Sequence, residues 1–400
     1  MTETRTTATT TTAGALDGPA ILANARAIAP LLRAEAEGNE RRRRLSQRTV
    51  DALRTAGVFR ISTPRAWGGP EVDPWTQVEV VEAVAQADGS AGWCVMIGAS
   101  GGYFASHLAE RAARTLYRSL DAVTAGVPLP GGKLEPVEGG YLLTGRWPFV
   151  SGCTHADVVI VGGVVPPAGS PAPGEPPAIR VAALPADQVT IIENWDTTGL
   201  LGTGSHDVSA DDVFVPADHT FTWDETTRDE PLYAWTGMFL VNHLGVPLGI
   251  ARAALDAAAD ILLDKIIAPE MRPARDEPRV RVAVARAHAL VGSARSYAFD
   301  VVADFWATLT RGERPSRRQR AALAGAYVHT ARVCREAAEL LADAVGTSAV
   351  FRRCALERHR RDLATACAHL TAQDRFLELV GGLWIEGADL DHPLAAGGMI

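Results

Sequence analysis

The stretch from Gly139 to Gly152 holds the side chains best suited to contact a flat ring. It reads GGYLLTGRWPFVSG, so glycine breaks flank two aromatic residues and a serine. Trp147 and Phe149 can lie along a flat heterocycle, and the hydroxyl of Ser151 can offer that heterocycle a hydrogen bond. On these residues alone, a core strand that ends in a turn is the simpler explanation. The surrounding elements therefore decide between the two interpretations.

Charge and composition exclude several classes of partner. The net charge of −8 leaves no basic footprint, which argues against nucleic acid or an anionic membrane. The one basic run, Arg41 to Arg44, lies beside Glu37 and Glu40, as is typical of a solvated helix face. The ten histidines show neither HExxH nor HxxEH spacing, so metal chemistry has no support.

The cysteines and the N-terminus indicate a cytoplasmic protein. Five cysteines are scattered without a CxxC pair, so neither a disulfide framework nor a zinc site is indicated. Residues 1–17 begin with a threonine-rich run that lacks the apolar core of a signal peptide, and we expect a disordered tail. No apolar run reaches the roughly 18 residues that a membrane span requires.

The composition of the chain and the spacing of its apolar residues change twice, which predicts three parts. Residues 18–122 carry apolar side chains at helical spacing. Residues 123–225 are rich in Gly, Pro, Thr and Val, with short alternating runs that predict a small β-barrel or β-sandwich. Residues 226–400 return to alanine-rich helices and predict a four-helix bundle. The expected fold class is therefore α+β, mostly α-helical.

Local signals locate several of these elements. In the first part, Ser46 and Gly57 bracket one helix and Pro74 opens another. In the middle part, residues 166–177 form a Pro/Gly/Ser surface loop. Helical spacing predicts long helices in the last part, and their small-residue faces indicate an oligomer. These helices are expected at residues 250–263, 279–308, 317–345 and 356–380. The chain has no βαβ alternation and no dinucleotide-binding glycine fingerprint, which argues against a Rossmann fold.

Four motifs then occur in order: PRAWGG at 64–69, the 139–152 stretch, WDTTGLLGTGS at 195–205, and GTS with LERHRRD at 346–362. This arrangement resembles the acyl-CoA dehydrogenase fold, from about Gly18 to Leu383. Within that fold it is similar to the flavin-dependent monooxygenase branch, the two-component (group D) hydroxylases that act on 4-hydroxyphenylacetate or on a steroid-derived phenol. Ala355 departs from the pattern, which has proline there.

The monooxygenase branch is favoured over the dehydrogenases. The dehydrogenases need a glutamate base late in the last bundle, and the one nearby candidate, Glu378, is expected to be a helix-surface charge. The acidic strand that precedes the flavin loop in dehydrogenases is replaced by GVPLPGG at 126–132. An FAD-containing oxidoreductase of the acyl-CoA dehydrogenase type remains the alternative, and an inactive scaffold protein is a third possibility.

The resemblance implies a reduced flavin, FMNH2 or FADH2, supplied by a separate NAD(P)H:flavin reductase. This flavin would react with O2 to form a C4a-hydroperoxide and hydroxylate an aromatic or polyketide-type ring or an amine nitrogen. The resemblance places the hydroxyl of Ser151, next to Gly152, at the flavin N5. Trp147, Phe149 and Trp93 would form the apolar wall that excludes water. Without the resemblance, Ser151 is as readily a turn hydroxyl bonded to its own backbone.

His369 lies at the position of the family's general base. An imidazole suits that role because its ordinary pKa is near neutrality. Without the resemblance, a histidine among Ala366, Cys367 and Leu370 reads as a helix-face residue in the core or at an interface.

The flavin phosphate is expected to bind an arginine in the loop at residues 268–278. Arg272 is the first choice, with Arg275 and Lys265 as alternatives. Thr347 and Ser348, at the start of a helix junction, can add hydroxyl or backbone N–H groups.

One departure concerns the substrate. Several relatives place a substrate-binding histidine after the tryptophan that matches Trp93, but Gly101 and Gly102 occupy that position here and His107 lies further on. A bulkier substrate than a simple phenol is therefore expected. The full expectation is a cytoplasmic homotetramer that acts on a small molecule.

Overall fold

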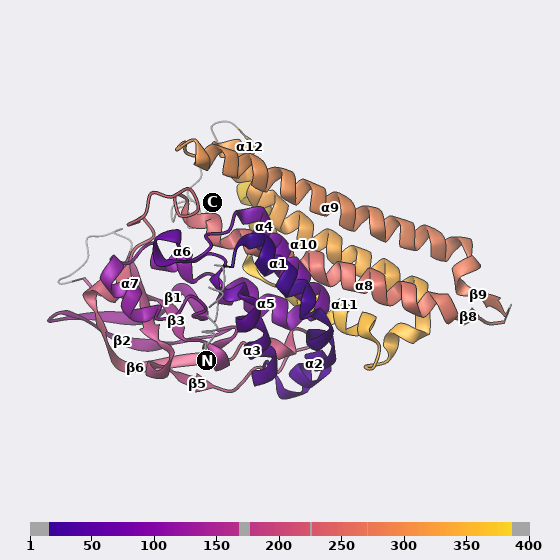
Figure 1. The fold of residues 1–400 in the computed structure, drawn as a ribbon, viewed down its shortest axis with the longest axis horizontal. Helices are drawn as coiled ribbons and strands as arrows, with labels where there is room; N and C mark the ends of the chain where they lie inside the picture. The colour runs from indigo at the N-terminus through magenta and orange to yellow at the C-terminus, as the bar shows by residue number, and fades with distance from the viewer. Residues whose placement is uncertain (1–15, 168–176, 225, 270, 386–400) are drawn as a thin grey trace, which may run out of the picture.

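The computed structural model describes residues 16–167, 177–224, 226–269 and 271–385. The predicted tail at residues 1–17 and the loop at 166–177 therefore fall almost wholly outside the described residues. A sheet lies at one end of the molecule, and the long helices of the last part extend side by side to the other end (Figure 1). The three-part helical, β and helical order that the sequence predicts is confirmed.

From residue 16 onward, seven described helices precede the sheet, and local signals explain most of their ends. Ser46 caps one helix by accepting the Thr49 N–H, and Gly57 ends it with a φ of 79°. Asp73 caps the next helix, which begins at Pro74. The seven helices are α1 (Gly18–Ala27), α2 (Ala29–Arg42), α3 (Gln47–Ala56), α4 (Pro74–Ala87), α5 (Gly89–Gly98), α6 (Gly101–Ala105) and α7 (Glu110–Leu116).

Helix α5 carries Trp93 and is buried along most of its length. Its residues are small or apolar, and it packs against α4, against α8 of the last part and against the 3-10 turn Leu201–Thr203. A helix that is buried on most sides can hold a side chain in a fixed position between the sheet and the bundle.

The described residues of the middle part form one mixed sheet of seven strands in the order β5-β6-β2-β1-β3-β4-β7. β1 and β2 form an antiparallel hairpin, and β1 also pairs with β3 in parallel. Alternate residues of β3 and β4 face two different apolar clusters, so both faces of the sheet are covered. The strands are β1 (Thr124–Val137), β2 (Gly140–Trp147), β3 (Val158–Val165), β4 (Ala178–Pro185), β5 (Thr190–Ile192), β6 (Asp207–Pro216) and β7 (Thr220–Phe221).

Up to residue 385, the described residues of the last part form five helices and a small hairpin. The helices are α8 (Gly245–Asp264), α9 (Pro278–Thr310), α10 (Arg317–Val345), α11 (Ala355–Ala366) and α12 (Asp374–Trp384). The hairpin, β8 (Ile266–Ile267) and β9 (Arg272–Pro273), lies at the end of the bundle remote from the sheet (Figure 1). In the described parts of the chain, no helix is long and apolar enough to cross a membrane.

One predicted helix is wrong. The expected helix at 356–380 is interrupted between α11 and α12 by residues 367–373, which include a 3-10 turn at Leu370–Ala372. Side chains compete for the backbone there: the ring of His369 accepts the Thr371 N–H, and the Gln373 amide donates to the Ala368 carbonyl.

Candidate functional site

Trp93 and Ser151 join the first helical part to the sheet. The indole Nε1 of Trp93, on α5, donates to the hydroxyl of Ser151 at 2.9 Å. Ser151 lies just after β2 and is buried. The hydroxyl that the sequence singled out is therefore held between two parts of the fold and is not bonded to its own backbone.

The loop that carries Ser151 has a strained backbone. Phe149 has a φ of 63°, and Gly152 has a φ of 75°. The left-handed region is costly for a phenylalanine and persists where neighbouring contacts impose it. Here the backbone N–H of Val150 donates to the backbone carbonyl of His206, and the backbone N–H of Gly152 donates to the backbone carbonyl of Thr203. These bonds hold the loop against residues 203–206, at the end of the WDTTGLLGTGS motif.

The hydroxyls of Ser151, Ser205 and Thr203 form a chain with one possible direction. Ser151 Oγ lies 2.7 Å from Ser205 Oγ, which lies 2.7 Å from Thr203 Oγ1. Thr203 bonds to the Leu200 carbonyl at 2.7 Å, and a carbonyl only accepts. Thr203 therefore donates to Leu200, Ser205 to Thr203 and Ser151 to Ser205. Trp93 Nε1 only donates, so Ser151 keeps one lone pair to accept from a bound molecule.

Asp362 anchors the far end of this chain to α11. Its carboxylate accepts the Leu200 N–H at 2.6 Å. Gly199 permits the close approach, because a Cβ there would lie 2.1 Å from the Arg361 carbonyl oxygen. Arg361 also donates to the Thr198 carbonyl. The Arg361-Asp362 pair of the sequence motif thus positions the 195–205 segment.

His369 lies on the other side of Trp93, in the break between α11 and α12. The Trp93 and His369 ring centroids are 5.4 Å apart, with the rings nearly perpendicular. His369 does not lie on a helix face, the alternative that the residues alone suggested, because its side chain caps the 3-10 turn by accepting the Thr371 N–H. Burial, with Arg375 nearby, lowers the pKa of His369 to about 4, so its ring is neutral near pH 7.

His369 lines a small cavity of about 20 Å³. That is roughly room for one water molecule, so an aromatic substrate enters only if the walls move. Ser151 is not among its lining residues, and Trp93 separates the hydroxyl from the cavity. The lining residues are Trp93, His243, Pro247, Tyr327, Ala331, Ala366, His369, Thr371 and Ala372.

Two residues of this cavity were missed by the sequence prediction. His243, at the junction with α8, lies with its ring centroid 5.0 Å from that of His369. Tyr327, on α10, is buried, and its hydroxyl has no hydrogen-bond partner in the described part of the chain. A histidine inside the apolar run Met238–Ile250 is the signal that could have drawn attention to His243.

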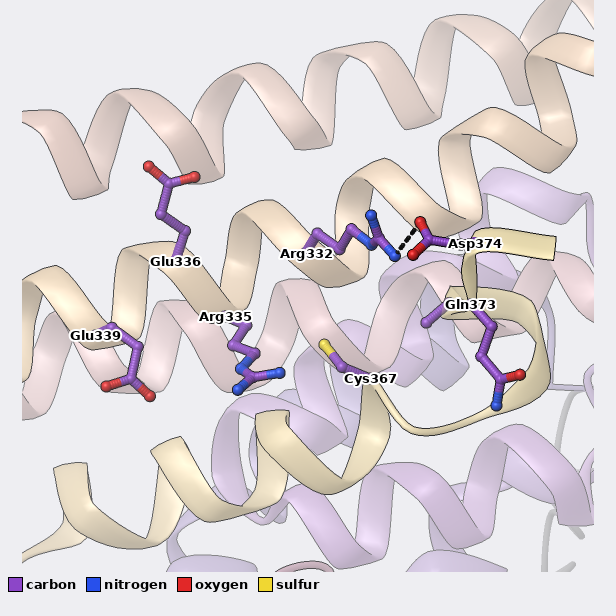
Figure 2. A pocket seen from close by; sticks show the side chains of 8 residues that line it. Arg332, Arg335, Glu336, Glu339, Cys367, Gln373 and Asp374 are labelled. Atoms are coloured by element: carbon purple, nitrogen blue, oxygen red, sulfur yellow. Dashed lines mark hydrogen bonds and ion pairs between the residues drawn. The ribbon is translucent and has the colours of Figure 1, made fainter. Parts of the chain in front are cut away.

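A larger, open pocket of about 620 Å³ lies against the same segment. Ala372 lines both spaces. Figure 2 shows Arg332 paired with Asp374 across this pocket, while Arg335 extends from α10 towards Cys367. Arg335 makes no ion pair with any described residue. The segment that carries His369 therefore lies between a small cavity and a larger, more open one.

The predicted aromatic wall is partly wrong. Trp147 has no exposed surface, and its Nε1 donates to the Gly162 carbonyl within the sheet, so it supports the loop from behind. Phe149 is 67% exposed and packs edge-on against Trp195. A bound molecule can reach Phe149 but not Trp147. His107, the alternative to a missing substrate histidine, stacks on Phe221 away from this cavity.

The predicted phosphate-binding residues lie elsewhere. Arg272 is in the β8–β9 hairpin and pairs with Glu277, and Lys265 donates to the Ser348 hydroxyl at 2.9 Å. Arg275 bonds to the Leu263 carbonyl, and Thr347 is exposed in the turn after α10. The β8–β9 hairpin lies at the end of the bundle remote from the sheet (Figure 1), and the Lys265–Ser348 bond brings the turn after α10 to the same end. A single chain therefore does not bring them to Ser151.

Two further observations concern other chemistries. Glu378 is exposed on α12 and does not line the cavity. Within the described ranges, no group of three or more His, Cys, Asp or Glu side chains is arranged to hold a metal ion, and the five cysteines are free thiols.

Two family models match this chain: the N-terminal domain of acyl-CoA dehydrogenase at residues 21–114 and its C-terminal domain at residues 243–374. Among curated relatives, the chain is 33% identical to an indole-3-acetate monooxygenase of Pseudomonas putida, over 86% of this chain and 88% of that protein. It is 32% identical to the oxygenase component of an FADH2-dependent resorcinol hydroxylase of a Rhizobium species, over 67% and 68%.

Solved structures agree. The chain superposes on a 3-HSA hydroxylase from Rhodococcus sp. RHA1 with a TM-score of 0.82 and 26% identity, over 90% of this chain and 95% of that one. The similarity covers the first helical part, the sheet and the bundle together.

Proposed function

Because the chain belongs to the acyl-CoA dehydrogenase family, among its flavin-dependent monooxygenases, we propose that it hydroxylates an indole-type aromatic ring. The enzyme is the oxygenase component of a two-component system. The observation that carries the site assignment is the placement of Ser151 and His369 on two sides of Trp93.

Reduced flavin, when bound, supplies the electrons that activate O2 for insertion into the substrate. The residues at Ser151 suit the reduced form, whose N5 carries a hydrogen. The hydroxyl chain turns a lone pair of Ser151 outward, so Ser151 is fixed as an acceptor. The exposed ring of Phe149, held by its strained backbone, offers a flat apolar contact beside it. Gly152 completes this loop.

Two groups of predicted flavin residues lie at opposite ends of one chain, which supports an oligomer. We assign Arg272, Thr347 and Ser348 to the phosphate end of a flavin whose ring lies at Ser151 of another subunit. This assignment requires at least a dimer, and a homotetramer is our proposal. In this arrangement Arg272→Ala weakens flavin binding and leaves the Ser151 loop intact.

The substrate class follows from the relatives and the cavity. Indole-3-acetate is the aromatic substrate named for one relative. The cavity is walled by aromatic and small apolar side chains, with the hydroxyls of Tyr327 and Thr371 and two imidazoles as polar groups, and it includes no described carboxylate. An acyl-CoA dehydrogenase needs a carboxylate base, so the lining favours the monooxygenase. The reductase partner, FADH2 as the preferred flavin and a cytoplasmic location belong to the same proposal.

Oxygen-isotope labelling tests this function. The full chain would be mixed with an NAD(P)H:flavin reductase, NADH, FAD or FMN, indole-3-acetate and oxygen-18 gas. We expect a product with one oxygen-18 atom, formed only when reduced flavin is supplied. A protein that retains a tight yellow flavin and oxidises an acyl-CoA without incorporating the label would contradict the proposal and favour the dehydrogenase alternative.

A further inference from the structure

The cavity beside Trp93 contains two histidines whose rings face each other. The centroids of His243 and His369 are 5.0 Å apart, and both rings lie within 6.4 Å of the Trp93 ring centroid. The two come from different elements: His243 from the 3-10 segment Thr236–Leu244 that precedes α8, and His369 from the break before α12. Each has one ring nitrogen, Nδ1, bonded to the protein, and Nε2 has no hydrogen-bond partner among the described residues. The bond made by each Nδ1 determines whether the Nε2 of the same ring donates or accepts a hydrogen bond.

The ring of His243 is held as one tautomer. Its Nδ1 lies 3.0 Å from the carbonyl oxygen of Leu240. A carbonyl oxygen only accepts, so Nδ1 carries the hydrogen. In a neutral imidazole the other nitrogen, Nε2, then has no hydrogen and offers a lone pair. His243 is therefore an acceptor towards the cavity.

The ring of His369 is held as the opposite tautomer. Its Nδ1 accepts the backbone N–H of Thr371, and an amide N–H only donates. The Thr371 hydroxyl, 3.0 Å from the same nitrogen, can donate to it as well. Nδ1 therefore has no hydrogen, and in the neutral ring Nε2 carries it. His369 is a donor towards the cavity.

We propose that His243 Nε2 is the proton acceptor for the substrate and that His369 Nε2–H is a hydrogen-bond donor to it. This inference rests on the proposed function, and it moves the base role from His369 to a histidine on another element. A substrate with a ring N–H or O–H would place that group at His243. The His369 donor would face an electron-rich atom of the substrate.

The neutral state of both rings is consistent with their surroundings. Burial, with a contribution from neighbouring His369, lowers the pKa of His243. Arg375 adds to the effect of burial on the pKa of His369. The other polar groups at the cavity are the hydroxyls of Tyr327 and Thr371, and burial raises the pKa of the tyrosine. The described lining thus holds no carboxylate that would stabilise an imidazolium.

The proton step is a simple transfer. The substrate N–H or O–H bond breaks, a new N–H bond forms at His243 Nε2, and the electron pair stays on the substrate heteroatom. That pair makes the aromatic ring more nucleophilic towards the oxygen that the flavin chemistry supplies. Imidazole then returns the proton to solvent or product. No other oxidant or reductant is involved.

Nuclear magnetic resonance of the flavin-free full chain, labelled with nitrogen-15 in histidine, tests the tautomers directly. The signals that disappear in His243→Asn and in His369→Asn assign the two rings. We expect the Nδ1–H form for His243 and the Nε2–H form for His369 at pH 7. The reverse assignment for either ring, or an imidazolium in either, would overturn the proposal. This measurement does not depend on whether the chain hydroxylates anything.

A second measurement tests the chemical role with indole-3-acetate and an added reductase. His243→Asn keeps an amide N–H for the Leu240 carbonyl but removes the acceptor nitrogen. We expect hydroxylation to slow by about 100-fold, the usual lower range for loss of a general base, with the consumed O2 released as hydrogen peroxide. Free imidazole should restore part of the rate. His288→Asn, on the exposed face of α9, is the matched control.

The outcomes separate the two claims. Unchanged product yield in His243→Asn, with the protein folded, would exclude His243 as the acceptor. A wild-type chain that makes no hydroxylated product would contradict the proposed function, and the tautomer spectra would still decide between the two rings.

Discussion

The indole nitrogen of Trp93 donates to the Ser151 hydroxyl at 2.9 Å, while the ring of Trp93 packs edge-on against His369. One side chain thus contacts the hydroxyl proposed to meet the flavin and the imidazole proposed to meet the substrate. A change at Trp93 should alter both sides of the site, and the predictions below follow from this arrangement.

Trp93→Phe removes the donor to Ser151 and keeps an aromatic ring. We expect a loss of about 1 kcal/mol in stability, the usual contribution of one hydrogen bond. We also expect more hydrogen peroxide per NADH oxidised, because the wall between the two sites loosens. Thermal melting and a peroxide assay measure the two effects. A variant with wild-type peroxide release would show that the indole nitrogen does not position Ser151.

Ser151→Ala should weaken binding of reduced flavin by roughly tenfold, since it removes one acceptor worth about 1 kcal/mol or slightly more. Ser205→Ala is the matched variant. It keeps the Ser151 hydroxyl but removes the partner to which that hydroxyl donates, so we expect a smaller loss. Anaerobic titration monitored by flavin fluorescence measures both. Equal affinities for wild type and Ser151→Ala would contradict the assignment.

Asp362→Asn should change how stability depends on pH. Burial, with Asp88 nearby, raises the pKa of Asp362 to about 7 from its ordinary 3.8. Between these values the folded chain binds a proton that the unfolded chain has lost, so this carboxyl lowers stability as pH rises from about 4 to about 7. Asparagine cannot ionise and can still accept the Leu200 N–H.

We therefore expect Asp362→Asn to gain stability over wild type at pH 8 compared with pH 5, by an amount on the order of a few kcal/mol. Melting temperatures of both proteins at the two pH values measure the difference. The same offset at both pH values would show that Asp362 is ionised in the folded protein.

Gly199→Ala should displace the loop that orients the hydroxyl chain. The added Cβ would lie 2.1 Å from the Arg361 carbonyl oxygen, which is backbone and cannot move aside alone. We expect the Leu200 N–H to lose its bond to Asp362 and to exchange faster with solvent. Hydrogen exchange measured by mass spectrometry over residues 195–205 tests this. Unchanged protection would mean that α11 and the loop move together.

The helices were predictable where a local signal decides their ends. Ser46, Gly57 and Pro74 mark boundaries through backbone chemistry that needs no tertiary context. The predicted helix at 317–345 matches α10 because its first-turn capping box, Ser316 with Gln319, is also local.

Two elements could not be found in this way. β1 contains prolines at 128, 130 and 136, and its pairing with β3 accommodates the first two through shifts in register. The break at 367–373 depends on His369 capping its own turn, whereas the surrounding residues keep helical spacing. The prolines therefore hid the strand in the first case, and helical spacing favoured a continuous helix in the second.

The residues of the candidate site also differ in whether the sequence could identify them. Ser151 and His369 came from the family resemblance, and the structure places them around Trp93. His243 was missed because its partner across the cavity lies more than a hundred residues away along the chain. Its own bond to Leu240 is local, but the tautomer that this bond fixes has a functional interpretation only because His369 lies across the cavity.

The cavity beside His369 has space for about one water molecule, so the size of the aromatic ring that it accepts depends on how far its walls can move. The Gln373 amide clasps the Ala368 carbonyl at 2.8 Å and so ties the ends of the segment that bears His369. Removing this hydrogen bond would let the segment move towards the larger pocket that Arg335 lines. Acceptance of bulkier aromatics could then be tuned by an engineer without replacing any side chain that meets the ring.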